Sequence, residues 1–477
     1  MTRLTILHTN DIHGRLEQLA RISTLAKRIR REVEESGGYC ALWDAGDVED
    51  PTLFESQVTK GSAALALLRA AGFDLAALGN ASPIRYGQQV VPNLAARFGR
   101  PLLCANMIDP DTSQLVPGLE PYTIQPFGEI NVGIIGLTAP MSIYSIFKLR
   151  MGDPVAMLPE LIAQVRARGA QTIVLLSHLG FDVGAVPDKQ VAEHVAGLDL
   201  IIGGHSHTQL DAPVMVKATL IAQAGEYGRF LGRVDLDIDP RSGKIIQHHG
   251  ELISVGEDIP LDGDVLAALA AEHAAVAQIL ARVIGELCAP IDWAADRQCA
   301  AGNLFADALL DHVQGAEIAL TLAGHWRGGL GAGALTVGAL TEALRSSANP
   351  ARVKLTGAQI VEFLRAALKP ENAARKPRPL RGVAVGMPHV AAMTVRYAAG
   401  TLEIVEARVG GEPLEPQREY IVAATDLEFS DLIGYFSVPE DQIEYEAPII
   451  MPEIVEAFVA AHSPLSAPAG GRVEAVR

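Results

Sequence analysis

Short apolar runs alternate with amphipathic stretches over residues 4–255. Residues 18–36 repeat apolar side chains at helical spacing and end at a Gly-Gly pair, which predicts a helix. A second predicted helix covers residues 60–71 and stops at Gly72. Three further segments have the apolar or alternating pattern of strands: residues 101–105, 131–137 and 232–239. The alternation of short strands with helices predicts a layered α/β domain.

The pattern changes at residue 262, where Ala becomes frequent and apolar residues continue at helical spacing to residue 287. We expect a long helix here that joins two halves of the chain. The second half mixes helical patterns, at 302–313 and 356–367, with strand patterns at 391–397 and 420–424. We therefore predict an N-terminal domain over residues 1–256, a helical connector over 257–283 and a smaller α+β domain over 284–477. A chain of 477 residues exceeds the size that one hydrophobic core usually serves.

The charge of the chain limits its partners. Asp and Glu number 56 against 39 Lys and Arg, and the formal net charge is -17. This excess opposes binding to a nucleic acid polymer or to an anionic membrane surface. No signal-peptide pattern precedes the first strand-like run, and we expect no apolar stretch long enough to span a bilayer. The four cysteines are widely separated. These features predict a cytoplasmic protein, although a chain trimmed of its export signal would look the same.

Residues that can hold a metal follow five of the apolar runs. They are Asp11 and His13, Asp47, Asn80, His178, and His205 with His207. Because ligands in open α/β sheets gather at the carboxyl ends of strands, we expect these side chains to converge. The two pairs also have a spacing that places both side chains on one side of an extended backbone. A single histidine of this kind is more often an ordinary core or surface residue, but the whole set favours a metal cluster.

Two-metal hydrolases need one bridging carboxylate together with several imidazole and oxygen donors. The predicted set contains these donor types, so the sequence indicates a hydrolase with two divalent metal ions. Manganese or zinc suits nitrogen and oxygen ligands, and the sequence does not choose between them. An anionic small molecule would be attracted to such a centre in spite of the negative net charge.

The motifs resemble those of a known family. Residues 8–14 (His-Thr-Asn-Asp-Ile-His-Gly), 44–47 (Asp-Ala-Gly-Asp), 79–80 (Gly-Asn), 177–180 (Ser-His-Leu-Gly) and 204–207 (Gly-His-Ser-His) are similar, in order, to the metal motifs of calcineurin-like metallophosphoesterases. The likeness is to the two-domain 5′-nucleotidase and UDP-sugar hydrolase family in particular, since residues 302–307, 349–350 and 354–357 resemble its C-terminal domain.

The resemblance implies a layered α/β/β/α metallophosphoesterase domain, followed by a 5′-nucleotidase-type domain that binds substrate. It also implies the metal ligands. Asp11, His13, Asp47 and His207 would hold one ion, and Asp47, Asn80, His178 and His205 would hold the other, so that Asp47 bridges the two.

The implied activity is hydrolysis of nucleotides or related phosphorylated small molecules, by attack of metal-bound hydroxide on phosphorus. One alternative is a catalytically weakened, metal-bearing protein that binds a nucleotide or a sugar phosphate. Another is attack on a thiosulfonate, since a relative in this family hydrolyses such groups on a carrier protein. The oligomeric state is left open.

One departure from the family lies beside Asn80. The family normally has a His directly after this Asn, which helps to neutralise the phosphate in the transition state, whereas this chain has Ala81. We predict that Arg85 supplies the missing cation as a catalytic residue, because a guanidinium can hold a phosphate with two hydrogen bonds. The alternative is that Arg85 is a solvated loop residue.

A second departure lies in the C-terminal half. Where the family has Asn-Gly-Gly-Gly-Ile-Arg and Gly-Gly-Asp-Gly-Tyr, this chain has Leu-Ala-Gly-His-Trp-Arg (322–327) and Asp-Leu-Ile-Gly-Tyr (431–435). The Arg and Tyr are retained, but the Asp expected to contact the ribose is not. We predict substrate-binding residues at Arg327, Phe429, Tyr435 and Phe436. The aromatic residues could equally belong to the hydrophobic core.

Overall fold

The computed structural model describes residues 1–50, 54–377, 384–430, 433–435 and 438–476. The chain divides into two compact units, Met1–Val276 and Ala277–Arg477. The division falls within helix α8 (Gly263–Ala281), inside the segment predicted as a connector.

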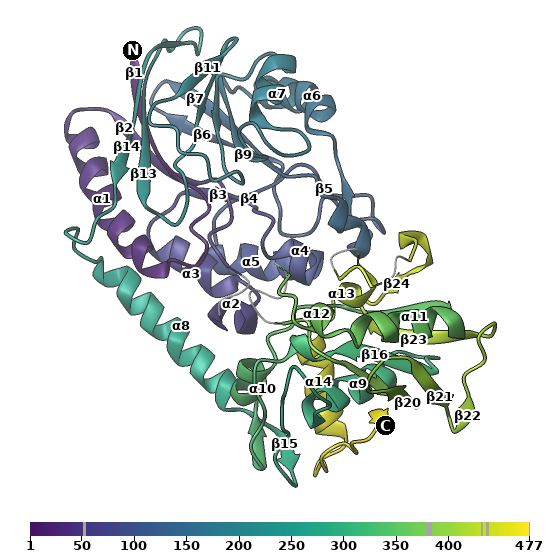
Figure 1. Cartoon of the computed structure of the whole chain (residues 1–477). Helices are drawn as coiled ribbons and strands as arrows, with labels where there is room; N and C mark the ends of the chain where they lie inside the picture. The colour runs from purple at the N-terminus through teal and green to yellow at the C-terminus, as the bar shows by residue number, and fades with distance from the viewer. Residues whose placement is uncertain (51–53, 378–383, 431–432, 436–437, 477) are drawn as a thin grey trace. The chain divides into compact units, whose positions relative to one another are not determined.

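Two six-stranded sheets form the centre of the first unit (Figure 1). The first has the order β14 (Ile245–Ser254), β13 (Phe230–Ile238), β1 (Thr2–Thr9), β2 (Tyr39–Asp44), β3 (Leu75–Ala77), β4 (Leu102–Leu103). The second has the order β11 (Val214–Val216), β12 (Thr219–Ala222), β10 (Leu200–Ile202), β9 (Thr172–His178), β7 (Ile130–Thr138), β6 (Tyr122–Phe127). Strands β1 to β4 run parallel, as do β7, β9, β10 and β12.

The two sheets pack face to face. Their inward side chains form one buried cluster, which includes Leu4, Ile6 and Trp43 from the first sheet and Ile134, Val174 and Leu176 from the second. Helices α6 (Pro154–Ala167) and α7 (Asp188–His194) cover the other face of the second sheet. Helix α1 (Leu16–Glu35) packs against β2 and against α3 (Ser62–Ala70), which contacts α5 (Val91–Phe98). The α/β/β/α layering implied by the resemblance is therefore confirmed.

The second unit is built on two smaller sheets. One has the order β19 (Pro388–Ala391), β16 (Ile318–Leu322), β23 (Glu419–Thr425), β18 (Pro350–Thr356), β24 (Glu444–Tyr445), and the other β22 (Glu412–Pro413), β21 (Ile404–Val409), β20 (Met393–Ala398), β25 (Val473–Val476). Helices α9 (Ala300–His312) and α14 (Met451–Ala461) pack together, and α11 (Gly357–Ala367) packs on β18. Their apolar side chains form two buried clusters, so this unit is the predicted α+β domain.

The remaining elements are short. They are α2 (Phe54–Thr59), α4 (Pro83–Tyr86), η1 (Gln88–Val90), β5 (Met107–Ile108), η2 (Ser142–Phe147), β8 (Arg150–Met151), β15 (Val283–Leu287), η3 (Ala323–His325), β17 (Gly333–Thr336), α10 (Val337–Ala343), α12 (Pro370–Ala373), α13 (Asp426–Phe429) and η5 (Glu440–Gln442).

Two predicted elements end differently from expectation. The helix predicted to run to residue 287 stops at Ala281, and the next residues form β15, which pairs with β17. The β-branched pair Val283-Ile284, followed by Gly285, favours a strand over a helix. The strand predicted over 391–397 is divided into β19 and β20 at Ala392, whose φ is 54°.

The expectation that no segment is long enough to span a bilayer is also wrong for α8. By length and composition this 19-residue helix is apolar enough to cross a membrane, because it is rich in alanine and carries few charges. However, two acidic residues of α8 form ion pairs with other helices of the first unit. Asp264 lies 3.0 Å from Lys27 of α1, and Glu272 contacts Arg97 of α5.

A buried histidine on β1 makes the stability of the first unit depend on pH. His8 is 1% exposed, and its ring occupies the space left by the missing Cβ of Gly232 on β13. Burial lowers the pKa of His8 to about 4.

The unfolded chain therefore takes up the proton first, near pH 6.5, and we predict that stability is lost as the pH falls from about 6.5 to about 4. We would measure the free energy of unfolding of chelator-treated protein against pH. Over this range it should fall more steeply in the wild type than in His8→Gln, and the two slopes should differ by up to about 1.4 kcal/mol per pH unit. The control is His248→Gln on exposed β14, which should keep the wild-type slope. Equal slopes for the wild type and His8→Gln would contradict the prediction.

Candidate metal centre

The loops that follow β1 and β2 run side by side. The backbone N–H of Asp11 donates to the carbonyl of Gly46 at 2.9 Å, and that of His13 donates to the carbonyl of Asp47 at 3.0 Å. Because β1 and β2 are parallel neighbours, both loops leave the same edge of the first sheet. These bonds bring the first predicted pair of ligands beside Asp47.

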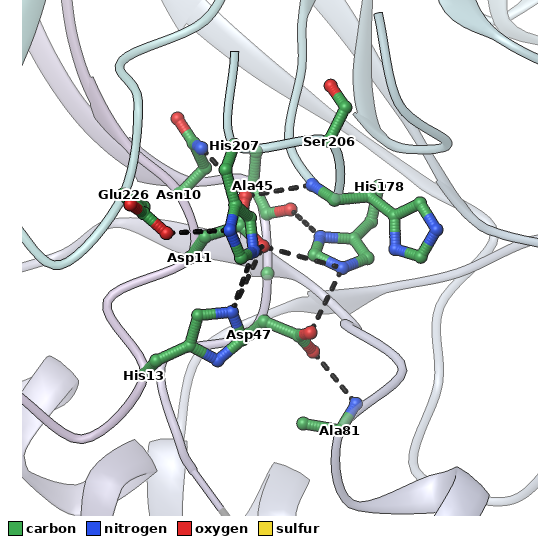
Figure 2. Close-up of polar contacts among 12 residues, drawn as sticks. Asn10, Asp11, His13, Ala45, Asp47, Ala81, His178, Ser206, His207 and Glu226 are labelled. Carbon is green, nitrogen blue, oxygen red and sulfur yellow. Dashed lines mark hydrogen bonds and ion pairs between the residues drawn. The ribbon is translucent and has the colours of Figure 1, made fainter. Parts of the chain in front are cut away.

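The other predicted ligands come from the second sheet and from β3. His178 is the last residue of β9, and His205 and His207 lie in the loop after β10. Asn80 follows β3. Figure 2 shows the side chains of Asp11, His13, Asp47, His178 and His207 gathered around one point. Among the described residues, two groups have ligand atoms that all lie within 4.8 Å of one another: Asp11 with His13 and His207, and Asp11 with Asp47 and His178.

The distances show how closely the groups approach. Oδ1 of Asp11 lies 3.4 Å from Nε2 of His207, 3.6 Å from Nε2 of His13 and 3.9 Å from Nε2 of His178. Oδ2 of Asp47 lies 3.3 Å from the same His178 nitrogen. The Nε2 atoms of His13 and His207 face each other at 3.0 Å. All of these atoms can be metal ligands, and Asp11 lies in both groups.

The backbone at this centre is not the extended chain that we expected for the two pairs. Five predicted ligands have positive φ: Asp11 (51°), His13 (47°), Asp47 (57°), His205 (72°) and His207 (56°). The prediction that an extended backbone aligns each pair is therefore wrong. Non-glycine residues in this region are strained by about 1–3 kcal/mol each, and such strain is retained mainly at functional sites.

Hydrogen bonds from outside the centre orient the imidazoles. Nδ1 of His178 donates to the carbonyl of Ala45 at 2.7 Å, and Nδ1 of His207 lies 2.7 Å from Oε2 of Glu226 (Figure 2). A ring that donates through Nδ1 keeps the lone pair of Nε2 for a metal. Oδ2 of Asp11 accepts from the backbone N–H of His205 at 2.8 Å and from the Asn10 amide at 2.7 Å.

Sequence reasoning missed Glu226 and Asn10. Glu226 lies in a Gly-Glu-Tyr-Gly turn four residues after the end of β12 (Thr219–Ala222), a strand that the sequence analysis did not predict. Asn10 stands beside Asp11, so its place in the motif was visible, but the direction of its side chain was not.

The electrostatics of the centre favour a cation. Asp11 is fully buried and Asp47 is 4% exposed. Burial acts to lower the pKa of His178, but the charges of Asp47 and Asp11 outweigh it and raise that pKa to about 10. The two carboxylates thus stabilise positive charge between them.

A divalent metal fits this environment. Among the described residues, three buried atoms at the centre make no hydrogen bond: Oδ1 of Asp11, Oδ1 of Asn80 and Nε2 of His178, whose approach to Asp47 is an ion-pair contact. All three atoms can coordinate a metal ion. A mixed set of nitrogen and oxygen ligands suits borderline divalent ions. The residues present therefore fit the metal centre implied by the resemblance.

Asn80 and His205 lie next to the two groups. A Cβ atom on Gly79 would be 2.0 Å from Oδ1 of Asp47, so only glycine lets the Asn80 turn approach Asp47 this closely. The ring centres of His205 and His178 are 5.2 Å apart. Burial lowers the pKa of His205 to about 4, which keeps it neutral, as a metal ligand must be.

Ala81 and Arg85 follow Asn80. The backbone N–H of Ala81 donates to Oδ1 of Asp47 at 2.8 Å, while its methyl side chain is 5% exposed. Arg85 lies in α4 and is partly buried. The catalytic role of Arg85 stays a prediction.

The predicted substrate residues of the second unit occupy different surroundings. Arg327 follows η3 and is partly buried. Phe429 and Tyr435 are 3% and 6% exposed and belong to a hydrophobic cluster, in which the ring of Tyr435 lies 5.8 Å from that of Phe363. Burial raises the pKa of Tyr435 to about 12. Phe436 lies outside the described residues. Binding of substrate by these residues stays a prediction.

The two units match two protein families. The calcineurin-like phosphoesterase family matches residues 4–209, and the 5′-nucleotidase C-terminal domain family matches residues 283–439. Together these matches cover the metal centre and most of the second unit.

Curated relatives and solved structures agree with the family matches. The chain is 27% identical over 467 residues to the uncharacterized metallophosphoesterase YunD of Bacillus subtilis, covering 96% of this chain and 98% of YunD. It is 28% identical to the 5′-nucleotidase of Bos taurus, but over 65% of this chain and 60% of that protein. Its fold is similar to the 5′-nucleotidase precursor of Thermus thermophilus (TM-score 0.53, 23% identity, 99% of both chains) and to NAD nucleotidase of Haemophilus influenzae (TM-score 0.61, 17% identity, 99% and 98%).

The contact between Glu226 and Nδ1 of His207 can be used to test whether His207 binds a metal ion. We predict that Glu226→Gln weakens metal binding by about 10- to 100-fold, because the ring of His207 loses the carboxylate that holds it. Competition between the protein and a chelating dye for Mn²⁺ measures this affinity directly. Glu251→Gln, an exposed substitution on β14 that also removes one negative charge, is the matched control. Equal Mn²⁺ affinity in the wild type and Glu226→Gln would contradict the assignment.

Proposed function

Because the chain belongs to the family that joins a calcineurin-like phosphoesterase domain to a 5′-nucleotidase C-terminal domain, we propose that it hydrolyses nucleotides or related phosphorylated small molecules at a centre of two divalent metal ions. Membership of this family and the names of the relatives make the chain a metal-dependent phosphoester hydrolase. We propose, in addition, that the centre holds two metal ions and that the substrate is a nucleotide or a related phosphorylated small molecule.

The observation that carries the proposal is the cluster of two buried carboxylates, Asp11 and Asp47, with the buried imidazole of His178 and the partly buried imidazoles of His13 and His207. We assign one ion to Asp11, His13, Asp47 and His207, and the other to Asp47, Asn80, His178 and His205. Bound divalent ions lower the pKa of coordinated water and withdraw charge from phosphoryl oxygens. Manganese and zinc remain the expected ions.

The protein groups contribute orientation and charge. The Ala81 N–H fixes one oxygen of Asp47, and the Ala45 carbonyl and Glu226 fix the rings of His178 and His207. A ligand set held in this way keeps its geometry while substrate binds and leaves. Arg85 is proposed to donate hydrogen bonds to a phosphate oxygen, in place of the family histidine that Ala81 replaces.

The substrate class rests on the relatives. The bovine and human proteins are named 5′-nucleotidases, which supports a nucleotide. The alternative, a metal-bearing binding protein with weakened catalysis, is favoured by Ala81 alone. The cytoplasmic location stays a prediction.

The first test is metal-dependent turnover. We predict that Mn²⁺-loaded protein hydrolyses a chromogenic phosphomonoester or phosphodiester, that EDTA stops the reaction and that Mn²⁺ restores it. Asp47→Asn should lose at least about a hundredfold in kcat/KM, because the shared carboxylate holds both ions. Asp258→Asn removes an exposed carboxylate and should leave turnover unchanged.

Metal binding without any turnover would favour the binding-protein alternative. The same assay on nucleoside monophosphates, UDP-sugars, cyclic nucleotides and sugar phosphates identifies the substrate. If the protein hydrolyses the chromogenic ester but none of these compounds, the nucleotide assignment is wrong and the hydrolase assignment stands.

The second test concerns Arg85. We predict that Arg85→Ala lowers kcat/KM on a good phosphoester about 100- to 1000-fold, the usual loss when one donor to the developing negative charge is removed. Metal content should stay at the wild-type level, since Arg85 is not a ligand. Arg100→Ala removes an exposed arginine after α5 and is the control. Unchanged turnover in Arg85→Ala would show that Arg85 has no catalytic role.

A further inference from the structure

A serine, a histidine and a glutamate of the second unit form a hydrogen-bonded series. Nδ1 of His325 lies 2.7 Å from Oγ of Ser346, and Nε2 of the same ring lies 2.8 Å from Oε1 of Glu428. His325 is the last residue of η3, Ser346 lies in the loop between α10 and β18, and Glu428 lies in α13. We call these three residues the Ser346 triad. The metal centre belongs to the other unit, and its proposed chemistry gives the triad no task.

The hydrogen bonds of Glu428 hold its side chain as a carboxylate. It is fully buried, and its oxygens accept from the hydroxyl of Thr321 at 3.2 Å, the backbone N–H of Leu322 at 3.2 Å and the backbone N–H of Thr425 at 3.0 Å. Burial acts to raise the pKa of Glu428, but the charge of protonated His325, together with hydrogen bonds from His325 and Thr425, outweighs burial and lowers that pKa. A carboxylate only accepts hydrogen bonds, so the N–H at Nε2 of His325 is the donor in the contact between them.

The tautomer of His325 follows from this contact. Because Nε2 carries the proton, Nδ1 of the neutral ring has a lone pair and accepts from the hydroxyl of Ser346. A serine hydroxyl that donates to an imidazole, which a carboxylate orients in turn, is the arrangement that activates serine as a nucleophile. In the usual form of this arrangement Nε2 faces the serine. Here the two ring nitrogens have exchanged places, and the proton can still pass from the hydroxyl to the ring.

The surroundings hold the base in place and leave the serine open to solvent. His325 is 2% exposed, and its ring stacks on the ring of Phe305 with the centres 4.5 Å apart. Ser346 is partly exposed. The backbone N–H of Ser347, the next residue, donates no hydrogen bond to any residue that the structure describes. A backbone N–H directly after a nucleophilic serine is a common donor to the negative oxygen that forms during acyl transfer.

The sequence sets His325 apart from the family motif. The fourth residue of the family's Asn-Gly-Gly-Gly-Ile-Arg stretch is glycine, whereas this chain has His325 at that place in Leu-Ala-Gly-His-Trp-Arg. Glycine offers no base. The triad is therefore not part of the machinery that the resemblance implies, and it indicates a separate reaction of this chain.

We infer that Ser346, with His325 as general base and Glu428 as the positioning carboxylate, forms a second hydrolytic site whose substrates are carboxylic esters. Oγ of Ser346 bonds to the carbonyl carbon of the ester while Nδ1 of His325 takes the hydroxyl proton. The imidazolium gives this proton to the leaving alcohol as the C–O bond breaks, and the acyl group stays on Ser346. Water then attacks the acyl group, His325 passes a proton of that water to Oγ of Ser346, and the carboxylic acid leaves.

Labelling with a fluorophosphonate in the presence of EDTA tests the nucleophile. In this reaction Oγ of a serine bonds to phosphorus, fluoride leaves and the histidine takes the hydroxyl proton. Mass spectrometry should find a single label on the wild type, at Ser346, and none on Ser346→Ala. His325→Gln should be labelled at least about 100-fold more slowly, because the general base is lost. Ser466→Ala removes an exposed serine of the second unit and should be labelled as the wild type is.

Hydrolysis of p-nitrophenyl acetate in EDTA tests the complete reaction. The wild type should release p-nitrophenolate catalytically, and Ser346→Ala should lose at least about a hundredfold in kcat/KM. Glu428→Gln keeps the size of the side chain but removes its charge. It should lower kcat at unchanged KM, which separates the positioning of His325 from a loss of substrate binding. Circular dichroism checks that each variant is folded.

The inference is overturned if the wild type is not labelled, if the label lies on another residue, or if Ser346→Ala hydrolyses the ester as fast as the wild type. Labelling of Ser346 without hydrolysis of the ester would also contradict the inferred activity. Because EDTA is present throughout, these results are independent of the proposed metal-dependent function.

Discussion

The burial of two carboxylates side by side is the constraint on which the centre depends. Asp11 and Asp47 are removed from water at the edge of the first sheet, and each points at the same histidine of the second sheet. Burying unpaired charges of one sign is strongly unfavourable, so this arrangement requires positive charge nearby. The raised pKa of His178 expresses that requirement, and two divalent ions would meet it more fully than a proton does.

The rest of the first unit serves to hold these groups. Parallel strands end at one edge of each sheet, the inter-sheet core keeps the two edges at a fixed distance, and hydrogen bonds between the loops align Asp11 with Asp47. The strain in five ligand residues is retained because the surrounding sheets determine the path of each loop. Glycines at positions 46, 79 and 204 stand where a Cβ would collide with Asp47, His178 or the backbone beside them. Packing thus holds the loops in place, and the side-chain atoms that remain without a hydrogen bond are the ones that can bind metal ions.

Much of the first unit could be predicted from the sequence, because the apolar runs that predict strands end at or shortly before residues that can bind a metal ion. Predicted metal ligands follow strands β1, β2, β3 and β10, and β9 ends on one, as the five apolar runs of the sequence indicated. The left-handed conformation of these residues could not be predicted, since it depends on contacts between loops far apart in sequence. The role of Glu226 could not be predicted either, because its contact with His207 depends on the tertiary structure. In the second unit, the burial of Phe429 and Tyr435 depends on tertiary packing, which aromatic character alone does not reveal.

Anomalous diffraction from crystals soaked in Mn²⁺ would locate each metal ion at the carboxylates of Asp11 and Asp47 without reference to turnover. We expect two anomalous peaks about 3.5–4 Å apart, with the carboxylate of Asp47 between them and the carboxylate of Asp11 beside one of them. A single peak away from Asp47, or no peak among these side chains, would contradict this expectation.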